Sequence, residues 1–463
     1  MKLFNTLSKQ KEELKPLRDK KIGMYTCGPT VYDVAHIGNL RKYICDDLLY
    51  RTLVANDYQV TRVMNITDVD DKTIKRAEGN RKKFEEQTKG FEVSFFEDLK
   101  KLNIVEPTEI TRATEYIDQM VEFIEDLIKK GYAYKTSDGS VYFSITKFKS
   151  YGKLSGLENR ELKVGARVNS DEYDKENPSD FALWKTWDES DGEIFWETSL
   201  GKGRPGWHIE CSAMAMDTLG TTIDIHTGGV DNIFPHHENE IAQSEARSDK
   251  KFVNYWVHNE HLLVDGRKMS KSLGNFFRLS DIEKKGYNPL DFRYLVSGAH
   301  YRSKLNFTWE GLEAAKNARE RLSRLLAAEA TGDLGIVNQT YLDQFNEKVS
   351  DDINIPEGLA VLWELVRDNT VTQQDKKATI LAMDKILGLN LVSSANRKQF
   401  SAEGKAMIIV GFESNPEIEG LVADREKAKK EKNFNQADTL REKIEKMGYK
   451  IEDTNIGPRL SKK

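Results

Sequence analysis

The pattern of hydrophobic and polar positions in the first 70 residues predicts two strands joined by a helix. Residues 21–27 alternate as a short strand does and stop at Gly28-Pro29, and residues 60–66 supply the next strand. A right-handed crossover makes two such strands parallel, and parallel sheets bind ligands at the carboxyl ends of their strands. We therefore expect an α/β fold whose active site includes Cys27 and the loop after it.

Helical spacing is present in the connection between these two strands and also in two later parts of the chain. Apolar side chains recur every four residues over 40–48, which predicts a helix with Asn39 near its cap. Residues 117–128 show the pattern of an amphipathic helix. From residue 309 onward the spacing stays helical, so this part is expected to be a helix bundle, with residues 351–356 as a connection between helices.

The composition is that of an ordinary folded, soluble protein. Of the 463 residues, 38% are hydrophobic and 31% are charged, which excludes disordered and collagen-like chains. The three cysteines form no disulfide framework and suit free thiols or metal ligands in a reducing compartment. No apolar stretch has signal-peptide or membrane-spanning length, so we expect a cytoplasmic protein without a membrane partner.

The net charge of −5 means that a nucleic-acid partner must be met by a local basic surface. Residues 421–463 offer one, because they hold twelve Lys and Arg against eight Asp and Glu, a local net charge of +4.

Two short motifs carry the first chemical signal. One is His36-Ile37-Gly38-Asn39, directly after the first strand, and the other is Lys268-Met269-Ser270-Lys271-Ser272. Together they resemble the paired motifs of the class I aminoacyl-tRNA synthetases. The second motif is specific even alone, whereas the first alone is weak. The alternative interpretation of the second is a solvated loop of lysine and serine.

The resemblance implies that both motifs bind ATP and act on its phosphates. When an amino-acid carboxylate attacks the α-phosphorus, negative charge builds on the phosphoryl oxygens and must be met by cations and donors. We expect unpaired N–H groups at the helix N-terminus near Gly38 and Asn39, and donation to a phosphate from His36. Lys268 and Lys271 are expected to converge on the phosphates from a mobile loop, and Mg²⁺ to accompany ATP.

Three longer segments narrow the resemblance to one branch of this class. Residues 25–30, 203–211 and 234–240 look like those of the cysteinyl-tRNA synthetases, and the likeness runs from Lys2 to about Pro458. It therefore covers nearly the whole chain.

The resemblance further implies one zinc ion per chain. The family's ligands, two cysteines, a histidine and a glutamate, match Cys27, Cys211, His236 and Glu240. His236 and Glu240 also stand four residues apart, hence on one helix face, whereas His237 has an isoleucine at that spacing and is the poorer candidate. Without the resemblance, Cys27 and Cys211 would be interpreted as buried structural cysteines, as Cys45 still is.

A zinc site explains how cysteine could be told from serine. Shape discriminates such near-isosteres by a factor of about ten to a few hundred only. Zinc favours a thiolate over a hydroxyl, so the substrate's sulfur is expected to take an added coordination position and no editing domain is needed. Trp207, close to Cys211, is expected to wall the amino-acid pocket, with packing in the core as the alternative.

Two further stretches are candidates for binding the substrates. Residues 224–231 suggest a strand, a tight glycine turn and an acid, which would place Gly229 and Asp231 near a ribose hydroxyl of ATP; an ordinary turn is the alternative. Thr67 or Asp68 follows the second strand and could meet the substrate's ammonium, although this acidic run could equally cap a helix.

The C-terminal part is expected to bind the tRNA anticodon. Residues 425–443 combine basic side chains with the aromatic ring of Phe434, which suits phosphate contacts and base stacking; a solvated helix face is the alternative. Many relatives carry an aromatic residue just after the Gly457 position, where this chain has Pro458-Arg459-Leu460.

These inferences combine into one expected architecture and function. We expect a Rossmann-like parallel-sheet catalytic domain with an insertion, then a helix bundle and a small C-terminal anticodon-binding domain. The expected boundaries are 1–120 with 222–256 for the catalytic domain, 121–221 for the insertion, 257–308 for the second-motif region, 309–392 for the bundle and 401–463 for the C-terminal domain.

The expected function is that of a monomeric ligase that joins cysteine to tRNA(Cys) with ATP. Two alternatives stay open: a ligase of cysteine and an aminosugar in thiol-cofactor synthesis, built on the same core, and a catalytically inactive RNA-binding relative. The bundle and basic tail argue against the first alternative. The intact phosphate-binding residues argue against the second.

Overall fold

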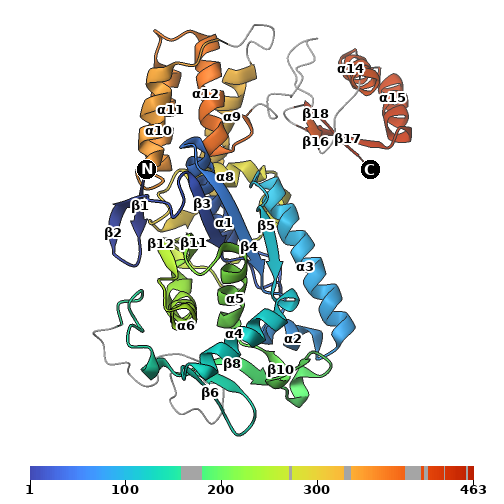
Figure 1. Ribbon diagram of the computed structural model, residues 1–463. Helices are drawn as coiled ribbons and strands as arrows, with labels where there is room; N and C mark the ends of the chain where they lie inside the picture. The colour runs from blue at the N-terminus through green and yellow to red at the C-terminus, as the bar shows by residue number, and fades with distance from the viewer. Residues whose placement is uncertain are drawn as a thin grey trace. The chain divides into compact units, whose positions relative to one another are not determined.

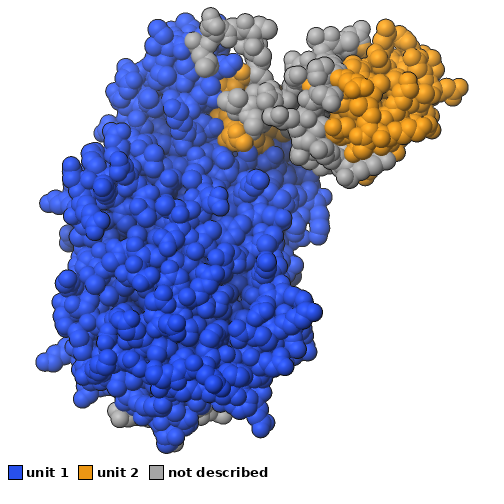
Figure 2. Space-filling view, turned by 45° about the vertical axis from the view of Figure 1, so that its right-hand side comes forward, with its two compact units in different colours: residues 1–318, 334–389 blue, residues 319–333, 390–463 orange. Residues whose placement is uncertain are grey.

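The computed structural model describes residues 1–157, 180–270, 274–327, 335–391, 408–410, 416–431, 433–454 and 457–462. The chain divides into two compact units, one of residues 1–318 and 334–389 and one of residues 319–333 and 390–463 (Figure 2). Among the described residues, none of the helices combines the length and the apolar character needed to span a lipid bilayer.

A five-stranded parallel sheet in the order β12-β11-β3-β4-β5 forms the centre of the first unit (Figure 1). Its strands are β3 (Lys21–Thr26), β4 (Gln59–Ile66), β5 (Glu109–Arg112), β11 (Ile223–Gly229) and β12 (Val253–Asn259). Each neighbouring pair is parallel, and β3 sets Ile22 against Val60. β11 is buried along its whole length, as expected of a strand covered on both faces. The two predicted strands and their parallel crossover are therefore confirmed.

Helices connect the strands of this sheet. They are α1 (Ile37–Ala55), α2 (Asp71–Ala77), α3 (Arg81–Lys101), α5 (Trp207–Leu219) and α6 (Glu238–Ser248), with a short 3-10 turn (Val230–Asn232) and a π-helical turn (Ile233–His237) before α6. The predicted helix over 40–48 is part of α1, where Leu40, Ile44 and Leu48 are all buried. The Rossmann-like core is thus built as the spacing indicated.

A second sheet lies within the chain segment between β5 and β11. It is reached through a 3-10 turn (Ala113–Glu115) and α4 (Ile117–Lys129), the predicted amphipathic helix. Its antiparallel order is β6-β7-β8-β10-β9. The strands are β6 (Ala133–Lys135), β7 (Val141–Phe143), β8 (Phe181–Thr186), β9 (Trp196–Thr198) and β10 (Gly201–Pro205), with 3-10 turns at Ile145–Lys147 and Glu189–Asp191. Stacked rings of Phe143 and Phe181, 5.0 Å apart, lie in its core.

Smaller elements complete the surroundings of the parallel sheet. A hairpin of β1 (Lys2–Asn5) and β2 (Gln10–Glu13) precedes it. A three-stranded sheet, β14-β13-β15, follows it, made of β13 (Leu262–Val264), β14 (Arg267–Lys268) and β15 (Leu305–Phe307), together with α7 (Leu279–Lys284) and α8 (Pro289–Ser297). The second motif begins in β14.

The predicted helices after residue 309 are present. They are α9 (Trp309–Ala327), α10 (Gln339–Ser350), α11 (Ile355–Arg367) and α12 (Gln373–Leu387). Residues 351–354 connect α10 to α11, which agrees with the expected connection.

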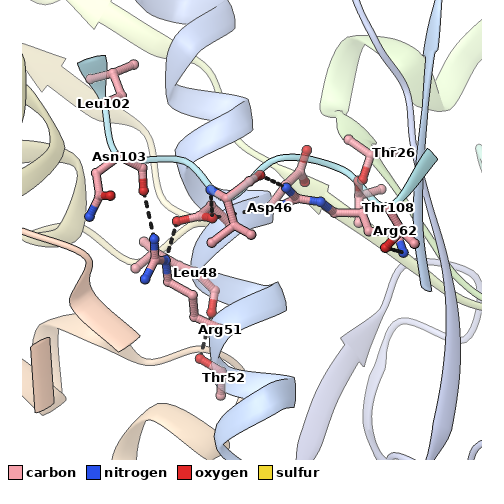
Figure 3. A network of polar contacts seen from close by, with 12 residues as sticks. Thr26, Asp46, Leu48, Arg51, Thr52, Arg62, Leu102, Asn103 and Thr108 are labelled. Atoms are coloured by element: carbon pink, nitrogen blue, oxygen red, sulfur yellow. Dashed lines mark hydrogen bonds and ion pairs between the residues drawn. The ribbon is translucent and has the colours of Figure 1, made fainter. Parts of the chain in front are cut away.

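A buried ionic network at Asp47 ties α1 to other parts of the first unit. The Asp47 carboxylate accepts hydrogen bonds from Arg51 Nε at 2.7 Å, the Val105 N–H at 2.8 Å and Arg293 at 2.6 Å. Figure 3 shows Arg51 reaching on to the carbonyl of Asn103, 2.7 Å away. Burial alone would raise the pKa of Asp47, but Arg293 and Arg51 together hold that pKa below its ordinary value.

The second unit has a small core of its own. Its elements are β16 (Ile408–Val410), α14 (Pro416–Lys430), α15 (Phe434–Lys446), β17 (Tyr449–Thr454) and β18 (Gly457–Lys462), with the sheet order β16-β18-β17. Ile418, Val422, Ile444, Ile451 and Leu460 fill this core.

Candidate active site

One cavity of about 510 Å³ lies at the carboxyl ends of the parallel strands, where β3, β4, β11 and β12 end. It collects most of the site residues expected from the sequence. Those that line it are Cys27, His36, Gly38, Asn39, Thr67, Trp207, Cys211, Gly229, Asp231, His236 and Lys268. Glu240 is fully buried and is not among the lining residues, and Lys271 lies outside the described residues.

Thiol, imidazole and carboxylate groups gather on one side of this cavity. One ligand atom each from Cys27, His236, His237 and Glu240 lies within 4.8 Å of the others. Cys211 Sγ is 3.9 Å from Cys27 Sγ, although 184 positions separate the two residues. These are the donor types that zinc prefers. The structure therefore brings three of the four expected ligands together with His237, and it places the fourth, Cys211, beside Cys27.

The protonation of this cluster shows how the donors depend on one another. A hydrogen bond from Cys211, together with the nearby His236, holds the pKa of Cys27 at about 5, against the effect of burial. The same hydrogen bond and burial raise the pKa of Cys211. Of the two thiols, only Cys27 is therefore easily charged, and a bound dication would allow both to be thiolates.

The carboxylate and imidazole of the cluster also form a charged pair. Burial lowers the pKa of His236, but Glu240 and Cys27 outweigh it and bring that pKa to about 10. Burial raises the pKa of Glu240, but His226 and His236 outweigh it and bring that pKa to about 2. Glu240 Oε1 is buried without a hydrogen-bond partner and lies 3.0 Å from His236 Nε2. A buried carboxylate oxygen beside imidazole and thiol groups fits a metal ion.

Neighbouring side chains fix the ring of His236. Its Nδ1 shares a hydrogen bond of 2.8 Å with Nδ1 of His208, and Trp207 stacks on it with 4.4 Å between ring centroids. Trp207 is 40% exposed and lines the cavity, so the alternative that it packs in the core is wrong. The wall expected at Trp207 is present.

The sequence pattern underestimated the part that other histidines play at the cluster. His237 Nε2 lies 3.5 Å from Cys27 Sγ, and its Nδ1 shares a hydrogen bond of 2.7 Å with His258 Nε2. His226 donates to Glu240 Oε2 at 3.0 Å. The helical spacing that made His237 a poor candidate does not apply, because residues 233–237 precede α6 and include the non-helical Phe234. Histidines in the buried strands β11 and β12 were the available signal.

A buried lysine was also missed. Lys42, in the second turn of α1, lines the cavity, donates to the carbonyl of Cys27 and forms an ion pair of 2.8 Å with Asp46. Its spacing of four residues from Gly38 and three from Asn39 on one helix could have indicated it.

The first motif forms the N-terminal cap of α1. His36 is the cap residue, and Asn39 lies near the cap as expected: His36 Nδ1 accepts the N–H of Asn39 at 3.1 Å, and Asn39 Oδ1 accepts the N–H of His36 at 3.2 Å. Because Nδ1 is an acceptor, the neutral ring carries its proton on Nε2. The expected unpaired N–H groups are partly used, since Asn39 is capped and the Ile37 N–H donates to the Phe277 carbonyl.

The second motif lies against the first. A methyl group at Gly38 would come 3.0 Å from Met269 Cε, and both residues line the cavity. Asn275 accepts from the Ser270 N–H at 2.8 Å and donates to the Lys268 carbonyl at 3.2 Å, which closes this segment on itself. Lys268 is exposed at the cavity.

The glycine pair before Asp231 is not the expected tight turn. Gly228 and Gly229 are the last residues of β11, and a Cβ on Gly228 would meet His237 Cε1 at 2.4 Å. Close packing rather than a turn therefore requires glycine here. Gly229 and Asp231 still line the cavity.

The acidic run after β4 divides between the two expected roles. Thr67 lines the cavity. Asp68 is instead engaged by Thr114, through its N–H at 3.0 Å and its hydroxyl at 2.6 Å, and Asp70 caps α2. Of the two candidates for the ammonium, only Thr67 lines the cavity.

Two basic side chains of the expected anticodon-binding segment form ion pairs within the second unit. Arg425 is buried and makes two hydrogen bonds of 2.9 Å to Asp453, which also pairs with Lys429 at 2.8 Å. Arg425 is therefore held inside the unit and is not part of an exposed phosphate-binding surface, and Lys429 shares its carboxylate partner. Phe434 is 61% exposed.

Comparison with known proteins identifies the same family that the sequence motifs resemble. Residues 13–317 match the family model of the tRNA synthetases class I (C) catalytic domain. The cysteine–tRNA ligase of Protochlamydia amoebophila is 46% identical over 100% of this chain and 98% of its own, and that of Brachyspira hyodysenteriae is 46% identical over 99% of each.

Solved structures share the fold at low sequence identity. The methionyl-tRNA synthetase of Mycobacterium tuberculosis with methionyl-adenylate is 13% identical, with a TM-score of 0.57 over 81% of this chain and 91% of its own. The LeuRS of Agrobacterium radiobacter K84, in a ternary complex with tRNA and LeuAMS, is 10% identical, with a TM-score of 0.59 over 97% of each chain. The chain belongs to the cysteine–tRNA ligase family of class I tRNA synthetases.

Proposed function

We propose that this protein is a cysteine–tRNA ligase that works in two steps. Cysteine and ATP first give cysteinyl-adenylate and pyrophosphate, and cysteine then passes to the terminal ribose of tRNA(Cys). The observation that carries the proposal is that the thiol, imidazole and carboxylate cluster opens on the same cavity as the two phosphate motifs. A thiol substrate and a nucleotide can therefore meet in one place.

The residues of the two motifs act on the phosphates. The cap fixes His36 with its proton on Nε2, from which it can donate to a phosphate oxygen as charge builds there. Lys268 at the cavity supplies a cation, and we assign the same task to Lys271. Mg²⁺ enters with ATP, and Gly229 and Asp231 at the end of β11 hold the ribose.

We assign the zinc site to Cys27, Cys211, His236 and Glu240. Zinc, when bound, offers a coordination position that favours the thiolate of cysteine over the hydroxyl of serine. We leave His237 outside this set because the family's ligands include a single histidine, although its Nε2 also lies at the cluster. His208 and Trp207 orient the His236 ring, as groups behind a metal ligand commonly do.

Two further regions complete the proposal. Thr67 meets the ammonium of cysteine, and the second unit binds the anticodon through Phe434 and the basic residues other than Arg425 and Lys429. We place the activity in the cytoplasm, where tRNA and ATP are present.

Cysteine-dependent exchange of pyrophosphate into ATP, followed by charging of tRNA(Cys), tests the function. We expect both activities, with serine inactive in the exchange. The cysteine–aminosugar alternative predicts exchange without charging, and it is disfavoured by relatives that match over the full length of this chain. Absence of exchange in protein that contains zinc would refute the proposal.

A further inference from the structure

One part of the cavity wall has no role in the metal site or the phosphate motifs. It consists of Tyr32, in the loop after β3, Lys72, in the first turn of α2, and Phe91 and Phe95, in α3. Phe95 is buried and packs edge-on against Tyr43. The rings of Tyr32 and Phe91 are partly exposed.

A side-chain cation lies over the ring of each of these two residues. Lys72 Nζ lies 5.0 Å from the centre of the Tyr32 ring, and Arg76 Cζ lies 4.8 Å from the centre of the Phe91 ring. Among the residues that the structure describes, neither Lys72 nor Arg76 forms an ion pair with a carboxylate. Nearby Lys83, by contrast, pairs with Glu78 at 3.0 Å. The two ring-bound cations therefore keep their charge for an external anion.

Aromatic faces next to unneutralised cations are the means by which proteins bind single-stranded nucleic acid. Bases stack on the rings and cations follow the phosphates. Two ring–cation pairs, Tyr32 with Lys72 and Phe91 with Arg76, offer this combination twice, which suits successive nucleotides of one strand. A single adenine, such as that of ATP, would use only one such pair.

The proposed reaction supplies the occupant, because its second step requires the terminal ribose of the tRNA in this same cavity. We propose that Tyr32 and Phe91, with Lys72 and Arg76, form the subsite for the unpaired 3′-terminal nucleotides of tRNA. The subsite rests on the proposed function, since it serves only the transfer step. It positions the terminal hydroxyl and takes no part in activating cysteine.

Single-turnover kinetics of the full-length protein test whether the subsite serves the transfer step and not the activation of cysteine. In Tyr32→Leu and Phe91→Leu, transfer of cysteine from preformed adenylate to tRNA slows about 10-fold for each lost stacking ring. The KM values for ATP and cysteine in pyrophosphate exchange stay at wild-type levels. Tyr32→Phe and Phe91→Tyr keep the rings and restore transfer. Val93→Ala, an exposed position of α3 outside the cavity lining, is the matched control and leaves both steps unchanged.

A binding cycle with shortened tRNA separates a subsite from a merely structural role. Removing the three 3′-terminal nucleotides weakens binding to the wild type about 100-fold, which is about 10-fold for each stacking ring, and leaves binding to the double variant Tyr32→Leu/Phe91→Leu unchanged. If the double variant responds to the shortening as the wild type does, the subsite is refuted. A raised KM for ATP would assign the rings to the adenine of ATP instead. Absence of exchange in the wild type would overturn the proposed function and the subsite with it.

Discussion

Replacing Asp47 by Asn tests how strongly the buried ionic network holds the first unit together. The substitution keeps the size of the side chain and an acceptor for the Val105 N–H, but it removes the charge that faces Arg293. Arg293 then keeps only carbonyl partners, among them those of Leu387 at 2.7 Å and Leu102 at 3.0 Å. A full positive charge is left buried.

The structure sets the size of the expected effect. Both side chains of the Asp47–Arg293 pair are 0% exposed, and their closest atoms are 2.6 Å apart. Removing one partner of a buried ion pair costs about 3–5 kcal/mol, because the remaining charge has lost its counterion and cannot reach water. Against the roughly 5–15 kcal/mol that stabilise a typical folded protein, this is a large share.

Thermal unfolding followed by circular dichroism measures the loss. Because the chain has two compact units, the quantity to compare is the midpoint of the transition in which the first unit unfolds. We expect this midpoint to be at least about 5 °C lower in Asp47→Asn than in the wild type. Glu85→Gln is the control: it breaks the Arg81–Glu85 pair, whose side chains are 39% and 62% exposed, and should cost no more than about 1 kcal/mol.

The pH dependence gives a second check with a definite sign. Because the pKa of Asp47 is lowered by folding, its contribution is present above the pKa of the unfolded chain and is lost as the pH falls through the folded value. The difference between wild type and Asp47→Asn should therefore narrow below about pH 4. A midpoint for Asp47→Asn equal to that of Glu85→Gln at neutral pH would show that the network does not stabilise the unit as argued.

Four other predictions concern the site and the units. Cys211→Ser should lose the one zinc per chain found by metal analysis of the wild type, whereas His237→Gln should retain it; the opposite result would exchange their roles. Lys271→Ala should raise the activation free energy of adenylate formation by about 2.7–4 kcal/mol, measured by pre-steady-state kinetics. An unchanged rate would remove the lysine from the phosphate site. Truncation before residue 401 should leave cysteine-dependent pyrophosphate exchange largely intact but abolish efficient charging; full charging would remove the anticodon role from the tail. Asp98→Asn should stabilise the protein above pH 7 by at most about 3 kcal/mol, because burial raises the pKa of Asp98 to about 6 and the wild type therefore gains stability as the pH falls from about 6 to 4; identical pH profiles in urea unfolding would refute this.

Local sequence patterns predicted the elements of the fold, and the family resemblance of the motifs indicated the chemistry. The period of two over residues 21–27 and the period of four over 40–48 depend only on neighbouring residues, and both elements are present in the structure. The first motif could be placed at the catalytic edge because it directly follows a strand. Even there, the choice of His36 over Asn39 as the cap required the backbone angles of the actual turn.

Contacts between distant residues were decided only by the tertiary structure. Nothing in the spacing of Cys27 and Cys211 indicates that their sulfur atoms lie 3.9 Å apart, because that distance results from the packing of α5 against the end of β3. The close approach of His237 to the end of β11 likewise brings this histidine to the cluster and makes Gly228 necessary where a turn was expected. Packing within the second unit buries Arg425 against Asp453, which a charge pattern cannot reveal. Periodicity records which face of an element is buried, whereas the partner across that face is set by how the elements pack in three dimensions.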